Sequence, residues 1–290
     1  MRKIYPIVFC AIVLNACKKW DKAEQVPSYI YIDHIDLSVN ATQGTASHGI
    51  IDAWVYVNDQ AVGVFNLPAT VPILASGNQK ITIAAGIKED GLTEHRAKYP
   101  LFQQFVKNID LVPGQIYNMT GADQPVVTYY PSTEVGIWYE NFDDAAIDFN
   151  TDPNSEAGIT YVYDTVNSFE GPGMGKIELG SGFSYARVIT AQTFILPKLG
   201  NPVFVELNYN TNNTMAIGIQ AINGTQFTTL DNTVLNPTNG EWKKIYVKLT
   251  EIVSEQSTAD SFKFIITVDK DSGVDVVQNY IDNFKVVYDK

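Results

Sequence analysis

The chain has few of the residues on which most catalytic and metal centres depend. It holds 290 residues but only two cysteines and three histidines. Both cysteines, Cys10 and Cys17, lie near the start, so the rest of the chain has no thiol for a disulfide, a metal cluster or a nucleophile. His34, His48 and His95 lack metal-ligand spacing, and no nucleophile elbow or P-loop motif is present. The sequence therefore favours a protein that is not an enzyme.

Positive charge is also scarce. Lys and Arg number 20 against 32 Asp and Glu, which gives a net charge of −12 at pH 7. Because nucleic-acid binding depends on Lys and Arg that neutralise phosphates, this balance argues against a nucleic-acid partner. Hydrophobic residues make up 45% of the chain and aromatic residues 12%, which is typical of a folded chain rich in β-structure.

Long apolar runs are missing as well. Residues 4–14 form the most apolar stretch near the N-terminus, and a permanent membrane helix needs ~20 apolar residues. Arg2 and Lys3 precede this stretch. A basic start followed by a short apolar run predicts a cleaved export signal over residues 1–16.

The signal ends in Leu14-Asn15-Ala16-Cys17, which resembles the lipobox of bacterial lipoproteins. The resemblance implies that Cys17 is acylated with more than one chain, palmitate among them, and anchors the protein in a membrane. Lys18-Lys19, where enteric lipoproteins kept at the inner membrane have Asp, favours the outer membrane, and the acidic Asp21 and Glu24 favour a position facing the cell exterior. Two alternatives stay open: an ordinary signal peptide with a chance cysteine, and an anchor that is not cleaved. Residues 17–27 are polar and predict a flexible tether.

Residues 28–121 carry short alternating segments separated by turns, about seven strands in all, which predicts an immunoglobulin-like β-sandwich. The slip in alternation at Asp33-His34 suggests a bulge within one strand over 29–39. Asn58-Asp59-Gln60 predicts a hairpin turn between strands over 52–57 and 61–65. Prolines in 67–72 place that segment at a sheet edge or in a crossover. Part of this region also resembles small surface domains of the PEGA type.

Residues 122–134 are rich in Pro and turn residues and predict a linker. Residues 135–290 hold eight or nine short β-rich segments without a sustained helical period, which predicts a jelly roll. The predicted fold class is therefore all-β, with an N-terminal Ig-like β-sandwich followed by a C-terminal jelly-roll β-sandwich.

The second predicted domain resembles jelly rolls of carbohydrate-binding modules. The motifs that carry the resemblance are Glu140-Asn141-Phe142-Asp143, Gly240 to Val247, and Tyr280 to Val286. The resemblance implies a glycan ligand and a possible structural Ca²⁺ held by Glu140, Asp143 and Asp282. The alternative is that Asp282 simply satisfies backbone groups in a turn. No other cofactor is expected.

Aromatic side chains that could stack on sugar rings occur along this second domain: Trp138, Tyr161, Tyr163, Tyr185 and Tyr209. The alternative for each is an ordinary core residue. Trp242 lies inside an alternating strand, and we assign it to the core.

The segment from Lys88 to Phe105 mixes Arg with aromatic residues, as protein interfaces do: Arg96, Tyr99, Phe102 and Phe105. The alternative is a crossover that packs its own aromatic rings. Two hypotheses follow. The first is a non-catalytic outer-membrane lipoprotein that binds glycan, and the second is an accessory subunit of an outer-membrane transport, secretion or assembly complex.

Overall fold

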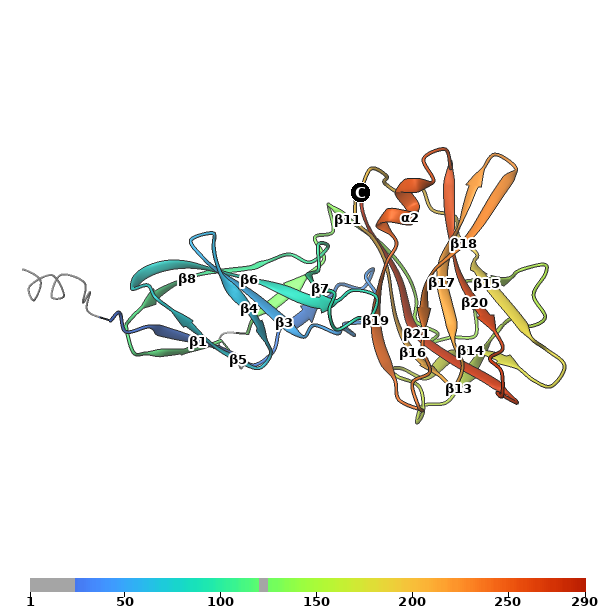
Figure 1. Cartoon of the computed structure of the whole chain (residues 1–290), viewed down its shortest axis with the longest axis horizontal. Coiled ribbons are helices and arrows are strands. Elements are labelled where there is room, and N and C mark those ends of the chain that lie inside the picture. Colours follow the sequence, from blue (N-terminus) through green and yellow to red (C-terminus); the bar gives the residue numbers. More distant parts are fainter. Residues whose placement is uncertain (1–23, 120–124) are drawn as a thin grey trace, which may run out of the picture.

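The computed structural model describes residues 24–119 and 125–290. The strands form two β-sandwiches placed end to end along the long axis of the molecule (Figure 1). The predicted all-β fold class is confirmed. The predicted signal peptide and Cys17 lie outside the described residues. Among the described residues, no helix is long and apolar enough to cross a membrane.

The first sandwich is built from two main sheets. One has three strands, in the order β5 (Ala69–Ile73), β1 (Ser28–Ile32) and β9 (Ile116–Asn118). The other has five strands, β4 (Gln60–Asn66), β3 (Asp52–Val57), β6 (Gly77–Lys88) and β7 (Arg96–Lys98), with β8 (Phe105–Leu111) also paired to β6. As predicted, the proline-containing segment lies at a sheet edge, as β5.

The β3–β4 hairpin was predicted from its turn residues. Its turn is Asn58-Asp59, with φ angles of 48° and 65°, and Val57 pairs with Gln60. Two successive positive φ angles are what a two-residue type I′ turn requires. Asn and Asp adopt positive φ angles more readily than most residues, so the local sequence favours the hairpin.

The predicted bulge at Asp33-His34 is wrong. Strand β1 ends at Ile32, and β2 (Asp36–Ser38) belongs to another sheet, where it pairs in parallel with β10 (Val127–Tyr129). The change of phase in the apolar pattern therefore marks a change of sheet.

The described part of the predicted linker contains a short strand. Residues 127–129 form β10, and Tyr130 directly after it is buried. The described part of the crossing between the sandwiches is thus held by a strand pair, because β10 binds β2 of the first sandwich.

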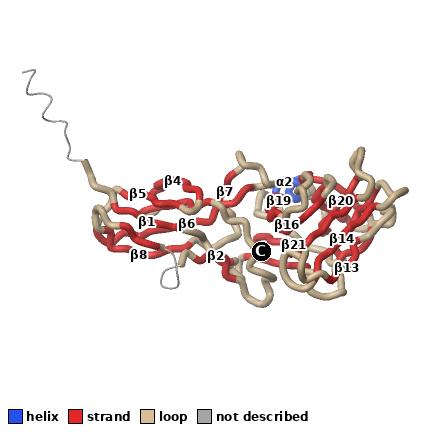
Figure 2. Tube along the Cα trace, turned by 90° about the horizontal axis from the view of Figure 1, so that it is seen from below, coloured by secondary structure: helices blue, strands red, loops and turns tan. Residues whose placement is uncertain are grey.

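The second sandwich has a front sheet and a back sheet. The front sheet contains β13 (Ile159–Tyr163), β14 (Gly173–Leu179), β21 (Val277–Asp289), β16 (Val203–Thr211) and β19 (Lys243–Lys248), with β11 (Val135–Glu140) also paired to β21. The back sheet runs β12 (Phe149–Thr151), β15 (Tyr185–Thr190), β20 (Ser261–Asp269), β17 (Met215–Asn223) and β18 (Gln226–Leu235). Figure 2 shows α2 (Thr250–Glu255) as the one helix of the described chain.

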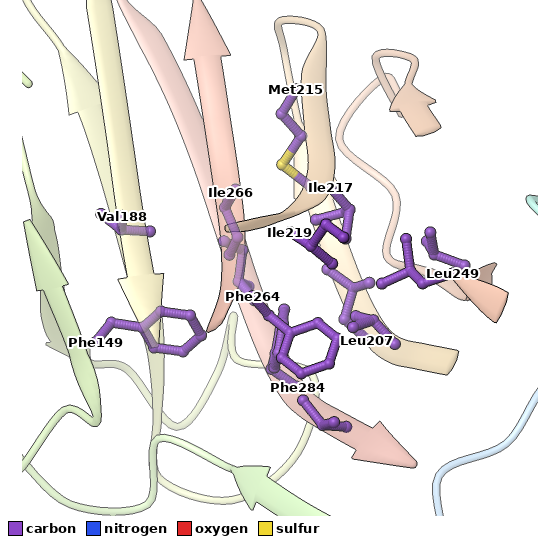
Figure 3. Packing of buried hydrophobic residues seen from close by; sticks show 14 of the residues in the cluster. Phe149, Val188, Leu207, Met215, Ile217, Ile219, Leu249, Phe264, Ile266 and Phe284 are labelled. Carbon is purple, nitrogen blue, oxygen red and sulfur yellow. The ribbon is translucent and has the colours of Figure 1, made fainter. Parts of the chain in front are cut away.

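The core of the second sandwich lies between these sheets. Phe264 from the back sheet and Phe284 and Leu207 from the front sheet are fully buried and meet there (Figure 3). Burying a side chain of this size stabilises the fold by about 1.5–3 kcal/mol. The other residues of β16 and β21 point to the outer face of the front sheet, where they are free to make other contacts.

Part of that outer face of the front sheet is covered by the first sandwich. Phe204, Tyr246 and Val287 belong to the same buried cluster as Tyr99 and Ile87 of the first sandwich. The Tyr99 ring centroid lies 5.0 Å from that of Phe204 and 5.1 Å from that of Tyr246. The two sandwiches therefore share an apolar core across their boundary.

Candidate functional site

The uncovered part of the front sheet carries a row of four side chains across neighbouring strands. Lys176 pairs in register with Tyr280, and Tyr280 pairs with Asn210 on its other side. Trp242, one residue before β19, completes the row next to Asn210, because Tyr209 pairs with Lys243. We call these four residues the platform. They line a shallow pocket of about 290 Å³.

The rim of this pocket is the loop after β13. Asp164 fixes the loop by accepting hydrogen bonds from the backbone N–H groups of Val166 and Asn167, at 3.0 and 3.1 Å. These bonds, and one from the Asn167 side chain, lower the pKa of Asp164. The carboxylate therefore stays charged and keeps the loop in one shape.

The Trp242 ring is held in place by the same loop. Its Nε1 donates a hydrogen bond to the carbonyl oxygen of Asn167 at 2.9 Å. The Phe169 ring lies edge-on, with 6.0 Å between the ring centroids. A half-buried indole fixed at its edge offers a preorganised apolar surface, which reduces the entropy lost on binding.

The polar members of the platform are also positioned. The side chain of Asn210 donates to the carbonyl of Gly240 at 3.1 Å and accepts from the Thr238 hydroxyl at 3.0 Å. The Lys176 ammonium lies 5.8 Å from the Tyr280 ring centroid and pairs with Glu178. This pairing and a bond from Gln278 lower the pKa of Glu178. Aromatic surface and fixed polar groups thus alternate along the row.

The five predicted aromatic residues do not come together. Trp138 packs against the core, with its ring centroid 5.6 Å from that of Phe194, and Tyr209 is buried in the same core. Tyr161 lies so close to Gly173 that a Cβ there would come within 2.3 Å of its ring. Tyr163 on edge strand β13 is 71% exposed.

Tyr185, the fifth, lies on the back sheet beside Arg187, whose guanidinium carbon is 5.5 Å from the tyrosine ring centroid. Burial is the main cause that raises the pKa of Tyr185. The sequence pattern did not predict the platform residues Trp242 and Tyr280 as ligand-binding residues. Trp242 is in phase with Lys244 and Lys248, and that was the signal that it faces outward.

The carboxylates named for calcium do not converge into one ligand set. Glu140 accepts from the backbone N–H groups of Phe142 and Asp148, both at 2.8 Å. Asp282 accepts instead from the N–H groups of Glu170 and Asn283, at 3.0 and 2.8 Å. No group of three or more His, Cys, Asp or Glu in the described chain is placed to hold a metal.

These contacts agree with the alternative interpretation of Asp282, in which its carboxylate accepts hydrogen bonds from backbone groups of a turn. Burial, together with the charges of Glu170 and Asp143, raises the pKa of Asp282 to about 7. Burial also raises the pKa of Asp143. The shared Ca²⁺ site implied by the resemblance stays a prediction.

The residues named for a protein partner meet the chain itself. Tyr99 and Phe102 are buried at the boundary between the sandwiches, so their rings are not exposed to an outside partner. Arg96 forms an ion pair with Asp52 at 2.8 Å and also contacts Asn66. Phe105 packs against the core of the first sandwich. The crossover alternative describes this segment better than an exposed docking loop does.

Comparisons with known proteins add the following. No protein-family model matches the chain, and no curated protein matches it. A solved carbohydrate-binding module described as promiscuous, from the β-sandwich superfamily, is 15% identical, with 91% of this chain and 99% of that chain covered and a TM-score of 0.39.

Two further solved structures are similar over about half of this chain. The CBM22-1 and GH10 modules of Clostridium thermocellum endo-1,4-β-D-xylanase 10B, complexed with xylohexaose, are 13% identical, with 52% of this chain and 28% of that chain covered and a TM-score of 0.38. A family 11 module from the same organism, in complex with a mixed-linked tetrasaccharide, is 8% identical, with 53% and 95% covered and a TM-score of 0.35. Similarities at this level do not identify the ligand of this chain.

Proposed function

We propose that this chain is a non-catalytic glycan-binding protein and that the platform is its binding site. The observation that carries the proposal is the row of Lys176, Tyr280, Asn210 and Trp242 across neighbouring strands. Strands lie 4.7–4.9 Å apart, so a row across four of them spans roughly 14 Å. That length suits a short stretch of a linear oligosaccharide.

The chemistry of the row supports a sugar ligand. The apolar C–H face of a sugar ring packs on an aromatic ring, and its hydroxyl groups need donors and acceptors at the side. Trp242 and Tyr280 supply the rings, while Asn210 and Lys176 supply polar groups between them. An open, shallow site of this kind admits an internal segment of a polymer as well as its end.

The test is a polysaccharide array probed with the full-length chain, followed by calorimetry on the best ligand. We expect Trp242→Ala and Tyr280→Ala each to weaken binding at least about fivefold, because one stacking ring is worth about 1–3 kcal/mol when truncated. Phe227→Ala is the matched control, since Phe227 is an exposed aromatic residue on the back sheet. Unchanged binding in both platform variants would refute the site.

We further propose that the protein is held at the outer membrane, facing the cell exterior, by lipid on Cys17. The support is the Leu14–Cys17 motif, together with the place where the described chain begins, at the end of the first sandwich away from the second (Figure 1). Mass spectrometry of the mature N-terminal peptide tests the modification. Cys17→Ser should release the protein from the membrane fraction, and protease added to whole cells should digest the native form.

A further inference from the structure

A second cleft lies between the two sandwiches. Its walls come from Gly49, Ile51, Lys88 and residues 90–92 of the first sandwich, and from Tyr209, residues 234–236 and residues 243–246 of the second. Its volume is about 550 Å³, which is within the range of small-molecule sites. It shares no lining residue with the platform.

The charge of this cleft is opposite to that of the whole protein. Three lysines line it, Lys88, Lys243 and Lys244, against one acidic residue, Asp90. The chain as a whole carries a net charge of −12. Within the described residues, neither Lys88 nor Lys243 has a carboxylate within 4.0 Å. Two cations with no ion-pair partner therefore line a cleft in an acidic protein.

The acidic residue of the cleft already has a structural task. Asp90 Oδ1 accepts a hydrogen bond from the Thr233 hydroxyl at 3.0 Å and one from the Lys248 backbone N–H at 3.1 Å. These bonds tie the loop after β6 to strands β18 and β19. Lys88 and Lys243, by contrast, have no carboxylate within ion-pair distance in the described chain.

Lys244 is a buried cation without a hydrogen bond. Its side chain is 7% exposed, and its Nζ has no hydrogen-bond partner, with the nearest carboxylate oxygen, from Glu206, at 3.8 Å. A buried ammonium group is costly unless it is paired and hydrogen-bonded. Its Nζ is enclosed by protein beside Glu206, so this charge is not open to a ligand in the cleft.

The remaining wall is apolar or carries neutral polar groups. Tyr209, Ile245 and Leu235 provide apolar surface, and Asn236 provides an amide. A purely inorganic anion would leave this surface unused. We propose that the cleft binds an anionic sugar of the uronate class, with its ring against the apolar wall and its carboxylate bound by Lys88 and Lys243. This site is independent of the platform.

Calorimetry on the full-length chain with digalacturonate tests the proposal, with the methyl ester of the same disaccharide as the neutral counterpart. We expect the acid to bind and the ester to bind at least about tenfold more weakly. Lys88→Gln and Lys243→Gln should each weaken binding of the acid about fivefold, and added salt should weaken it further. Lys80→Gln is the matched control, because Lys80 pairs with Asp59 on the β3–β4 hairpin side of the first sandwich.

The outcomes separate this site from the platform. Trp242→Ala should leave digalacturonate binding unchanged. The proposal is overturned if the ester binds as well as the acid, if both lysine variants bind like the native chain, or if inorganic phosphate displaces the acid at equal concentration. Loss of digalacturonate binding in Trp242→Ala alone would also overturn it, since that result would assign the ligand to the platform.

Discussion

The hydroxyl of Tyr99 donates a hydrogen bond of 2.6 Å to the carboxylate of Glu206, across the boundary between the two sandwiches. Glu206 is fully buried, and Tyr130 also donates to both of its oxygens, at 2.9 and 3.0 Å. A buried carboxylate without such donors costs several kcal/mol. Docking of the first sandwich therefore supplies the hydrogen bonds that make this residue tolerable in the front sheet.

We expect Tyr99→Phe to lower the free energy of unfolding by about 1–3 kcal/mol, because it removes a donor to a buried charge and keeps the ring. Urea denaturation followed by fluorescence measures this. Tyr163→Phe serves as the control, since that side chain is 71% exposed, and it should change stability by less than about 0.5 kcal/mol. Equal effects of the two substitutions would show that the bond to Glu206 contributes nothing.

Gly218 allows two strands of the back sheet to approach closely. A Cβ at this position would lie 2.1 Å from the carbonyl oxygen of Leu230 and 2.8 Å from the Cα of Asp231. Asp231 reaches past it to accept a hydrogen bond from Thr267 at 2.7 Å. We expect Gly218→Ala to destabilise the protein by about 2 kcal/mol or more, because backbone must move.

Gly180→Ala is the comparison for that substitution, since nothing lies within 4 Å of a Cβ at Gly180. Thermal unfolding of both variants gives the answer. A melting temperature for Gly218→Ala as high as that for Gly180→Ala would contradict the close approach.

Lys244 should make the free energy of unfolding depend on pH in the alkaline range. Burial lowers its pKa to about 8, below the ordinary value of 10.5. Between these values the unfolded chain binds a proton that the folded chain has lost, so the contribution of Lys244 to stability rises with pH. Relative to Lys244→Met, the native chain should gain up to about 1.4 kcal/mol per pH unit between about pH 8 and 10. A constant difference across that window would contradict the assignment.

Asp282 should act in the opposite direction at acidic pH. Burial, followed by the charges of Glu170 and Asp143, raises its pKa to about 7 from an ordinary 3.8. Between these values the folded chain keeps a proton that the unfolded chain has lost, so the contribution of Asp282 to stability falls as pH rises. Chemical denaturation at about pH 4 and about pH 7 should show the native chain losing stability relative to Asp282→Asn. A gain instead would mean that the carboxylate is ionised when folded.

Local patterns predicted the strands well where one face is apolar and a turn follows, as in the β3–β4 hairpin. Local patterns are less informative for a strand that is buried on both of its faces. In β11, Val135 packs toward the first sandwich while Trp138 packs into the second, so no alternation distinguishes them. Burial of Glu206 could not be predicted, because its donors Tyr99 and Tyr130 are 107 and 76 residues away in the sequence.

The candidate site shows the same limit. Lys176, Tyr280 and Asn210 come from three segments far apart in the sequence, and only strand order and register align them. Trp242 was within reach of the sequence, since Ile245, Val247 and Leu249 occupy the opposite phase and face the core. Alternation alone does not say which phase faces the core; the apolar residues at 245, 247 and 249 do, and they assign Trp242 to the surface.

The strand pair formed by β10 and β2 ends where the second sandwich begins, so the crossing between the two bodies leaves little room for a hinge. In every copy attached to a surface through its N-terminal residues, the platform would then keep one position relative to the first sandwich. A single long polymer could then engage several copies at once. Weak individual contacts would add up to strong retention, because each bound copy raises the effective concentration of the polymer at the next one.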